Sequence, residues 1–516
     1  MRKLFKLLTS RLFITALAIL IELALIIVVL LLLNNFVNYY SYLYLVFSFV
    51  SIVTMLYIVS CRGNVAYTVS WLFFVGALPL IGTACYLIFG RKRFTKRQQR
   101  KVQPIIKSLE SARYDNHYLK LLNKESEDAQ MMMSYVFNMS KIPPFNNTEV
   151  SYFKLGDEVW PKMLEELKKA RHYIFLEYFI ISKGKMWDSI LTILKEKASE
   201  GIDVRVLYDD FGSISYLPNH YPEKLKKMGI KCIAYNRFKP IINVKMNNRD
   251  HRKIMVIDGH TGFTGGINIA DEYVNLKVKF GHWKDNAIML KGEGVWGLTS
   301  MFLSMWSLAS GVYENQADYH YDKYANELGY NPKSTGFVQP FGDIPYDYEP
   351  LAETIYIQTL MKAKKYVYIT TPYLILSPEL EFALCATAKQ GVRVVILTPH
   401  IPDKKLVFSV TKSYYRNLLE AGVKIYEYTP GFVHSKMFVS DDAIAIVGTA
   451  NLDYRSMFLH FECGTICYKV PAIMEMKKDF EECLNVSQEI PTSSVKNLSV
   501  LKRLWWGFLK VFATLM

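Results

Sequence analysis

The most constraining feature of this sequence is an internal repeat. KKARHYIFLEYFII returns as MKAKKYVYITTPYLI, and KASEGIDVRVLYD returns as TAKQGVRVVILTP. LKKMGIKCIAYN then returns as LLEAGVKIYEYT, and RDHRKIMVIDGHTGFTGGIN returns as GFVHSKMFVSDDAIAIVGTAN. Because the four pairs occur in the same order, this part of the chain contains two copies of one unit. Two such copies can pair about a pseudo-two-fold axis, so that a residue near the axis appears twice in one shared site.

Each copy alternates strand patterns with helix patterns. The apolar run HYIFLEYFII (residues 172–181) predicts a buried strand, DSILTILKEKASEG predicts an amphipathic helix, and IDVRVLYD (residues 202–209) predicts a second strand. Such alternation is typical of a mostly parallel or mixed sheet covered by helices on both faces. We therefore predict an α/β protein with tandem units at residues 150–320 and 321–516, preceded by a basic lead-in segment at residues 91–149.

The first ninety residues are hydrophobic in a different way. Apolar runs cover residues 12–32, 42–60 and 65–89, and only CRGN separates the second run from the third. Each run is long enough to cross a bilayer as a helix. The basic start MRKLFKLLTSR could belong to a secretory signal, but the first run is too long and no small-residue cleavage site follows it. We predict transmembrane helices within residues 1–90 and a multi-pass protein of the cell membrane.

The charges that flank this region leave the membrane topology open. MRKLFKLLTSR precedes it and GRKRFTKRQQRK follows it, and basic residues favour the cytoplasmic side. Three full spans would place these segments on opposite sides. Either one run is re-entrant or interfacial, with the run that contains Pro79 a candidate, or one basic segment breaks the rule. We predict a cytoplasmic catalytic part. The last residues, LKRLWWGFLKVFATLM, fit either a terminal core helix or a helix among lipid headgroups.

Each copy carries the pattern HxKxxxxD, followed by glycine and asparagine. The motif residues are His251, Lys253, Asp258 and Asn268 in the first copy and His434, Lys436, Asp441 and Asn451 in the second. On a strand, residues i and i+2 share a face, so each histidine points the same way as its lysine. The aspartates have the opposite parity and follow the strand. This parity favours a structural role for them over contact with substrate, although they stay in our candidate catalytic set.

Brought together at one axis, these groups form a site suited to a phosphodiester. The lysines and asparagines can bind the non-bridging oxygens, and the lysine charges can stabilise the transition state. One neutral imidazole can attack phosphorus, and the other can protonate the leaving alkoxide and then deprotonate the incoming hydroxyl. Each imidazole needs a group that orients its other nitrogen. The candidates are Asp285 in GHWKDNAIML and Glu462 in FLHFECGTI.

The sequence indicates no metal and no cofactor. We find no carboxylate–histidine cluster suited to a divalent metal, and the two motif lysines can supply the positive charge that many phosphoryl-transfer sites take from one. The seven cysteines include no CxxC pair, and we predict that all of them are reduced. The net charge of +15 suits either nucleic acid or an anionic membrane. The apolar runs favour lipid as the partner.

The paired motifs resemble the signature of the phospholipase D superfamily and, within it, the bacterial cardiolipin synthases. NNRDHRKIMVIDG with GFTGGINIADEY, and GFVHSKMFV with GTANLDYRSMFLHFE, are similar to the two active-site segments of that family. NVAYTVSWLFFVGALPLIGTACYLIFGRKR is similar to its membrane hairpin. Gly266 and Thr449 depart from the wider superfamily, which often has serine there, and the run at residues 12–32 is an addition.

The resemblance implies phosphatidyl transfer. One phosphatidylglycerol would give its phosphatidyl group to a histidine and release glycerol, and a second would accept the group to give cardiolipin. In the superfamily the histidine of the first motif is usually the nucleophile, which corresponds to His251, with His434 as acid and base. The sequence leaves this order open, and it leaves the oligomeric state open too. The expected partners are phosphatidylglycerol and cardiolipin in the membrane, without nucleic acid.

Several other functions would use the same pattern. A phospholipase D-type hydrolase or a phosphatidylserine synthase would use the same site with another acceptor. A nuclease of this fold would suit the basic charge, but the membrane hairpin argues against it. A non-enzymatic membrane scaffold would have no need of two complete HxK pairs.

Overall fold

The computed structural model describes residues 40–61, 64–90, 117–237, 248–320, 334–346, 349–496 and 499–515, with single positions at 20, 24, 28 and 323. Apart from positions 20, 24 and 28, the predicted span at residues 12–32 lies outside the described residues, as does the basic segment at residues 91–101. Within the described part of the chain, no helix combines the length and the apolar character needed to cross a bilayer. The transmembrane helices therefore stay a prediction.

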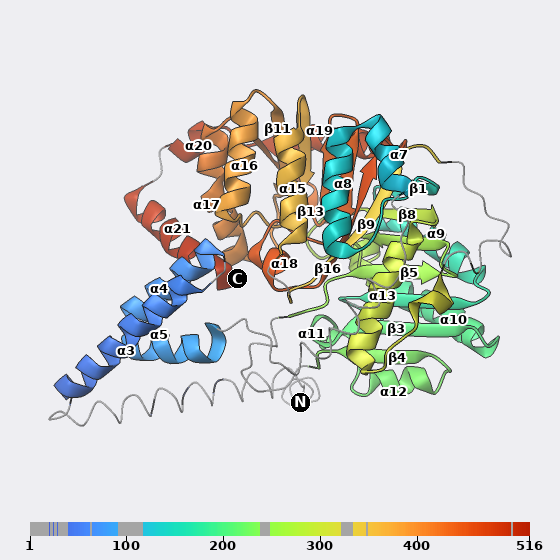
Figure 1. The fold of residues 1–516 in the computed structure, drawn as a ribbon, viewed down its shortest axis with the longest axis horizontal. Coiled ribbons are helices and arrows are strands. Elements are labelled where there is room, and N and C mark those ends of the chain that lie inside the picture. Colours follow the sequence, from blue (N-terminus) through green and yellow to red (C-terminus); the bar gives the residue numbers. More distant parts are fainter. Residues whose placement is uncertain are drawn as a thin grey trace.

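The first unit is built on a seven-stranded mixed sheet with the order β1-β8-β6-β5-β2-β3-β4 (Figure 1). Its strands are β1 (Thr148–Phe153), β2 (Tyr173–Tyr178), β3 (Asp203–Asp209), β4 (Lys231–Tyr235), β5 (Lys253–Ile257), β6 (Thr261–Gly265) and β8 (Ala287–Gly292). β2, β3 and β4 run parallel, and the other pairings are antiparallel. β2 and β5 are buried along their whole length, which explains their continuous apolar sequences.

The second unit repeats this sheet strand for strand and adds one edge strand. The order is β17-β12-β11-β10-β14-β15-β16-β9, so β9 takes the place of β1 and β14 the place of β5. The strands are β9 (Phe337–Asp343), β10 (Tyr366–Thr370), β11 (Arg393–Pro399), β12 (Lys424–Tyr428), β14 (Met437–Ser440), β15 (Ile444–Gly448), β16 (Glu462–Tyr468) and β17 (Ser487–Glu489). The shared order confirms the duplicated α/β unit that the sequence predicts.

Helices cover the sheets of both units. Those of the first unit are α9 (Gly156–Lys168), α10 (Lys185–Ser199), α11 (Asp210–Ser213), α12 (Tyr221–Lys226), η4 (Asp271–Val274), α13 (Val295–Ser310) and η5 (Gln316–Tyr319). Those of the second are α15 (Leu351–Lys362), α16 (Pro378–Lys389), α17 (Lys405–Glu420), α18 (Tyr454–Phe458), α19 (Ala472–Asn485) and α20 (Ser493–Lys496). The amphipathic segment that predicts a helix forms α10.

One hydrophobic core joins the two units. It combines side chains of β2, β5 and α13 with side chains of β10, β14 and α19. The contacts are reciprocal, since α13 of the first unit packs on β9 of the second, and α19 of the second unit packs on β1 of the first. Separate cores fill the remaining face of each sheet. The units are therefore fixed against each other by apolar burial, the dominant favourable term in folding.

The lead-in segment packs on the second unit before the chain enters the first. α7 (His117–Glu125) and α8 (Glu127–Ser140) form a helical pair, and α8 contacts α15 and β9. Ser126 caps α8 by accepting a hydrogen bond from the Ala129 N–H (3.3 Å). Met132 and Met133 are fully buried in the core of the second unit. From His117 onwards, the lead-in segment is thus an integral part of the fold.

The second and third apolar runs form α3 (Tyr40–Ser60), α4 (Val65–Ala77), α5 (Pro79–Cys85) and the π-helix η2 (Tyr86–Gly90). Asn64 caps α4 by accepting from the Ala66 and Tyr67 N–H groups. The run that contains Pro79 is divided at Leu78, because proline favours the first position of a new helix. A side chain at Gly82 would collide with the Phe74 carbonyl, so α5 and α4 pack closely.

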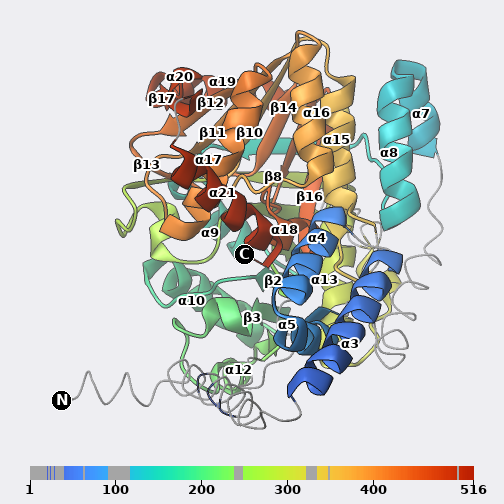
Figure 2. The ribbon, with the colours of Figure 1, turned by 90° about the vertical axis from the view of Figure 1, so that its left-hand side faces the viewer.

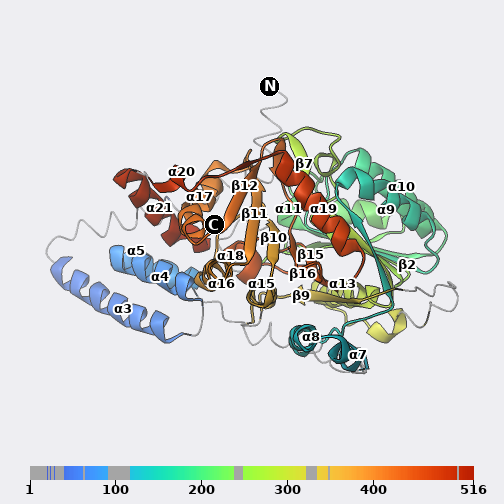
Figure 3. The same cartoon turned by 90° about the horizontal axis from the view of Figure 1, so that it is seen from above.

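The C-terminal helix connects these helices to the catalytic part. α21 (Val500–Phe512), followed by η6 (Ala513–Leu515), contacts both α17 and α4. The rings of Phe73 and Phe512 lie 6.2 Å apart, and the Thr514 hydroxyl donates to Ser70 Oγ (2.8 Å). α3, α4, α5 and α21 lie on the same side of the molecule (Figures 2 and 3). The ends of the described chain therefore meet in one helical group.

The aspartates that complete the two motifs tie strand ends to the neighbouring strand. Asp258 accepts backbone hydrogen bonds from Arg171, His172 and Tyr173 at 2.8 Å each. Asp441 accepts from Lys364, Lys365 and Tyr366 in the same way. Both residues have positive φ, 51° and 53°, at the turn after the strand. The placement of Asp258 and Asp441 in the candidate catalytic set therefore needs correction, because their carboxylates are occupied by the backbone at the start of β2 and β10.

We expect Asp258→Asn to lower the free energy of unfolding by about 2–3 kcal/mol, because an amide nitrogen replaces one acceptor oxygen of a buried, charged hydrogen-bond set. Asparagine tolerates positive φ, so backbone strain does not add to this change. The midpoint of chemical denaturation measures it. Glu165→Gln is the control, because this half-exposed carboxylate forms exposed ion pairs with Lys162 and Lys169, and we expect almost no shift. A stable but inactive Asp258→Asn would return Asp258 to the catalytic groups.

Candidate active site

Two reciprocal backbone pairings bring the motifs together. Before β5, the His251 N–H donates to the Phe461 carbonyl (2.9 Å), and the Phe461 N–H donates to the Arg249 carbonyl (2.8 Å). In the second motif, β13 (Gly431–Val433) pairs in parallel with β7 (His282–Lys284) of the first unit. The His434 N–H then donates to the Lys284 carbonyl (2.7 Å). Each motif is thus paired with the segment that carries the carboxylate of the other unit.

Each motif histidine is oriented across the axis. His251 Nδ1 lies 3.0 Å from both carboxylate oxygens of Glu462, and His434 Nδ1 lies 2.7 Å from Asp285 Oδ2. Both orienting candidates from the sequence therefore meet a histidine, in each case the histidine of the other repeat. A carboxylate at Nδ1 favours a proton on that nitrogen and leaves the lone pair of Nε2 free.

Burial sets the charge of these four groups. It lowers the pKa of His251 to about 3 and the pKa of His434 to about 4, so both rings are neutral near pH 7. Burial alone would raise the pKa values of Glu462 and Asp285. The facing histidines outweigh this effect. They hold the pKa of Glu462 well below its ordinary value, and they also lower the pKa of Asp285. The site therefore pairs two neutral imidazoles with two ionised carboxylates.

The motif lysines are almost entirely buried. Lys253 is 1% exposed and Lys436 is 2% exposed. Lys253 Nζ donates to the His251 carbonyl (2.5 Å), and Lys436 Nζ donates to the His434 carbonyl. Lys436 Nζ also lies 2.9 Å from His434 Nδ1, which keeps its proton toward Asp285. Burial lowers the pKa of Lys253 to about 8 and that of Lys436 to about 7. An anionic phosphodiester would favour the charged form of both.

Two residues that the sequence marks as departures lie against the orienting carboxylates. The Thr449 hydroxyl is 2.5 Å from Glu462 Oε2 and donates to it. At the equivalent position Gly266 has no side chain, and a Cβ there would collide with the Asp285 carboxylate. Asp285 instead accepts from the Asn286 N–H (2.9 Å). The longer Glu462 is thus held by a hydroxyl, and the shorter Asp285 is held by backbone.

The two histidines have different aromatic neighbours. The ring of Phe179 lies 5.0 Å from that of His251, and the ring of His460 lies 5.6 Å from it. Around His434 the rings are Tyr273 at 5.3 Å and Trp283 at 5.5 Å. Sequence reasoning missed these residues. Trp283 and His460 each stand two positions before the orienting carboxylate, and this shared spacing is the signal that could have found them.

The two motif asparagines have partners within the protein. Asn268 Oδ1 accepts from the Ile180 N–H (3.0 Å), and its Nδ2 donates to the Tyr273 hydroxyl (2.8 Å). Asn451 Nδ2 donates to Asp453 Oδ2 (3.0 Å). Within the described residues, each amide nitrogen donates one hydrogen bond and has a second N–H available. Their role in phosphate binding stays a prediction.

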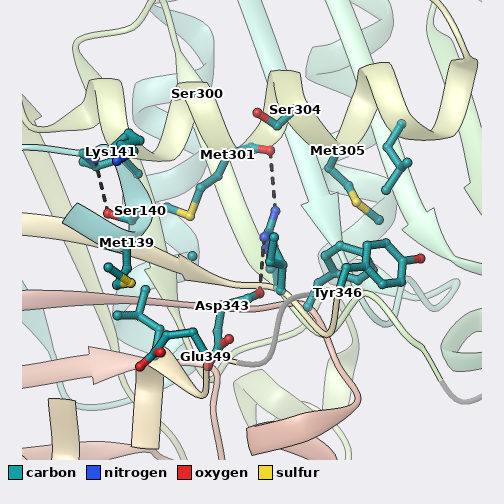
Figure 4. A pocket seen from close by; sticks show the side chains of 17 residues that line it. Met139, Ser140, Lys141, Ser300, Met301, Ser304, Met305, Asp343, Tyr346 and Glu349 are labelled. Carbon is teal, nitrogen blue, oxygen red and sulfur yellow. Dashed lines mark hydrogen bonds between the residues drawn. The ribbon is translucent and has the colours of Figure 1, made fainter. Parts of the chain in front are cut away.

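A cavity of about 190 Å³ lies on the other side of the first catalytic strand (Figure 4). Arg252 lines it, since its parity is opposite to that of His251 and Lys253. The guanidinium donates to the Glu462 carbonyl (3.2 Å) and lies 3.7 Å from the Glu177 carboxylate. Met301, Met305, Asp343, Tyr346 and Glu349 also line the cavity. Arg252 therefore braces the backbone next to the orienting carboxylate.

One group of described residues has the composition of a metal site. His251, His460 and Glu462 each offer a ligand atom, and these atoms all lie within 4.8 Å of one another. This group corrects the expectation that the chain has no carboxylate–histidine cluster suited to a divalent metal. His460 was missed because it is far from His251 in the sequence and because its counterpart in the other repeat is Trp283.

Comparison with known proteins gives a consistent picture. The profile of a family described as cardiolipin synthase, PLD-like domain, matches residues 163–294 and 356–484. A cardiolipin synthase of Alkalihalophilus pseudofirmus is 35% identical over 451 residues, which cover 85% of this chain and 86% of that protein. Cardiolipin synthase 2 of Bacillus anthracis is 35% identical over 427 residues, which cover 82% of each chain.

The fold also occurs among solved structures. The phosphatidylserine synthase of Haemophilus influenzae superposes with a TM-score of 0.55 at 16% identity, covering 75% of this chain and 98% of that chain. At this identity the likeness concerns the fold alone.

The buried lysines predict an unusual pH dependence. If their charge stabilises the transition state, kcat/KM on a phosphodiester should fall as the pH rises through about 7–8, because the ammonium groups of the free enzyme then lose their protons. An unburied lysine would stay charged to about pH 10. The fall in kcat should come at higher pH, since the bound anion favours the charged lysines. Lys436→Arg keeps its charge and should lose the lower of the two transitions, whatever its absolute rate. A kcat/KM that stays flat to pH 9 would contradict this role.

Proposed function

The chain belongs to the cardiolipin synthase family of phospholipase D-like proteins and is a phosphatidyltransferase, and we propose that it joins two phosphatidylglycerol molecules into cardiolipin and releases glycerol. The observation that carries this proposal is the reciprocal orientation of His251 by Glu462 and of His434 by Asp285. It provides two neutral imidazoles with free Nε2 atoms beside two buried lysines. These are the groups that a two-step displacement at phosphorus requires.

In the first step, Nε2 of His251 attacks the phosphorus of one phosphatidylglycerol. The bond from phosphorus to the glycerol oxygen breaks, and His434 supplies the proton that this oxygen takes up. His434 is neutral in the free enzyme, so its Nε2 first takes up a proton from solvent when the diester binds, favoured by the negative charges of the diester and of Asp285. Lys253 and Lys436 stabilise the charge that gathers on the non-bridging oxygens. The product of this step is a phosphatidyl group on His251 and free glycerol.

In the second step, a hydroxyl of another phosphatidylglycerol enters where glycerol left. His434, now neutral, takes the hydroxyl proton, and the oxygen attacks phosphorus while the bond to His251 breaks. The products are cardiolipin and the starting enzyme. One phosphodiester replaces another, so the exchange requires no nucleotide and runs in both directions.

The exposed apolar residues support a membrane location. α3 and α21 carry large apolar side chains on their surface, namely Leu45, Phe49, Leu56, Leu501, Leu504 and Trp505. α21 also carries Lys502 and Arg503, which suit anionic headgroups. Because α21 contacts α4, these surfaces belong to one side of the molecule (Figure 2). We propose that this side meets the bilayer and keeps the acceptor lipid more abundant at the site than it would be in water.

The roles of the two histidines can be separated with an activated substrate. A p-nitrophenyl ester of phosphatidic acid has a leaving group that departs without a proton donor. His434→Ala should therefore still release p-nitrophenol in a burst and retain the phosphatidyl group on His251, while its multiple turnover falls about 10³-fold or more.

On the same ester, His251→Ala should give neither burst nor covalent adduct. Mass spectrometry of the protein detects the adduct, and His400→Ala serves as the control, because this half-exposed histidine pairs with Glu427 outside the site. The reverse pattern would exchange the two roles. Near-normal turnover of phosphatidylglycerol by either single variant would contradict the shared site.

Lipid products test the function itself. Purified protein with pure phosphatidylglycerol should give cardiolipin and glycerol in equal amounts without CTP, and excess glycerol should convert cardiolipin back to phosphatidylglycerol. Thin-layer chromatography with a glycerol assay measures both directions. Phosphatidic acid as the main product would indicate the hydrolase, and a requirement for CDP-diacylglycerol would indicate a phosphatidylserine synthase-like reaction.

A further inference from the structure

We infer that His251, His460 and Glu462 form a binding site for a transition-metal ion of the Zn²⁺ type, and that the bound ion inhibits the enzyme. Each residue offers a ligand atom, and these atoms lie within 4.8 Å of one another. The inhibitory effect rests on the proposed role of His251 as nucleophile. The binding itself depends only on the geometry.

The measured distances approach those of a tetrahedral site. His251 Nδ1 lies 3.0 Å from the Glu462 oxygens, and His460 Nδ1 lies 3.7 Å from Glu462 Oε1. Zinc bonds of about 2.1 Å at tetrahedral angles separate neighbouring ligand atoms by about 3.4 Å. The two distances lie on either side of this value, so small rotations of the side chains would complete the site.

The donor set selects the kind of ion. Two imidazoles and one carboxylate suit zinc and similar transition metals, whereas magnesium and calcium prefer oxygen ligands. His460 Nδ1 is a buried atom that makes no hydrogen bond within the described part of the chain. Both carboxylate oxygens of Glu462 lie 3.0 Å from His251 Nδ1, so either of them can serve as the oxygen ligand. Three ligands leave a fourth position for water.

Among the residues that the structure describes, His434 has no such group of ligands. Trp283 takes the place of His460 there, and an indole nitrogen is a donor without a lone pair for a metal. Lys436 Nζ also lies 2.9 Å from His434 Nδ1, and its charge would repel a cation. The structure therefore assigns about one ion to each chain.

Metal binding would block the nucleophile by moving the ring proton of His251 from Nδ1 to Nε2. In the resting site Nδ1 of His251 carries the proton that faces Glu462, and Nε2 has the lone pair. An ion on Nδ1 takes up the lone pair of that nitrogen, so the ring proton must move to Nε2. No proton is gained or lost in this shift. Nε2 then has no lone pair with which to attack phosphorus.

Direct binding tests the site without any lipid. The purified full-length protein, stripped with a chelator, is titrated with Zn²⁺ against a chromogenic zinc indicator, and with Co²⁺ to record the visible absorption of tetrahedral cobalt. We expect about one tightly bound ion per chain. His460→Trp, which copies the other repeat, and His460→Asn should both lose it. His400→Asn, which removes a histidine paired with Glu427, should keep it.

Turnover tests the effect. Within each protein, activity with zinc is compared with activity in excess chelator, so a change in basal rate does not matter. Zinc at about ten times its Kd should leave about a tenth of the activity of the native chain, and the His460 variants should be insensitive.

Three outcomes would overturn the inference: equal zinc binding by the His460 variants, binding without inhibition, and equal inhibition of all variants. A protein that binds zinc but forms no cardiolipin would refute the proposed function and leave the metal site intact.

Discussion

The structure depends on the exchange of orienting carboxylates between the two repeats. Glu462 belongs to the second unit and holds His251 of the first, while Asp285 belongs to the first unit and holds His434 of the second. Backbone pairing enforces this exchange, because the residue before each carboxylate bonds to the histidine N–H of the other unit. Neither repeat alone has an oriented imidazole. The shared core of α13 and α19 then keeps the two halves in register.

This arrangement buries several charges, and the function follows from that burial. An isolated ion transferred from water to a protein interior loses several kcal/mol, even after relaxation. Here Lys253 and Lys436 face Glu462 and Asp285 within one network, so each charge is partly compensated. The same desolvation keeps both histidines neutral. It also lowers the pKa values of the two lysines toward neutral pH, so that binding of an anionic substrate shifts them to the charged form. A solvated version of the site would lose these properties.

Much of the fold and of the site could be predicted, because both depend on patterns of residues that are close together in the sequence. The repeat predicts the same alternation of strands and helices twice, and the two-residue period places His251 with Lys253 on one face. The partners of the histidines could be named as candidates, but which carboxylate serves which histidine depends on pairing across the axis. His460 was not predicted, because the equivalent position of the other repeat is Trp283 and the two copies therefore do not match there. The hydrogen bonds of Asp258 were not predicted either, because they involve backbone some 85 residues earlier. Contacts of this kind carry no local signal.

The duplication has left two sites that are no longer equivalent, and the differences favour one order of events. Both carboxylate oxygens of Glu462 face His251, and Thr449 fixes one of them, so this ring has a single orientation. A nucleophile benefits most from such rigidity, because it must align with the bond that breaks. His434 meets one oxygen of the shorter Asp285, a single contact that holds this ring less tightly. A ring that must gain and lose a proton in each cycle fits that surrounding. The asymmetry thus supports His251 as nucleophile and His434 as acid and base, an order that the paired motifs alone leave open.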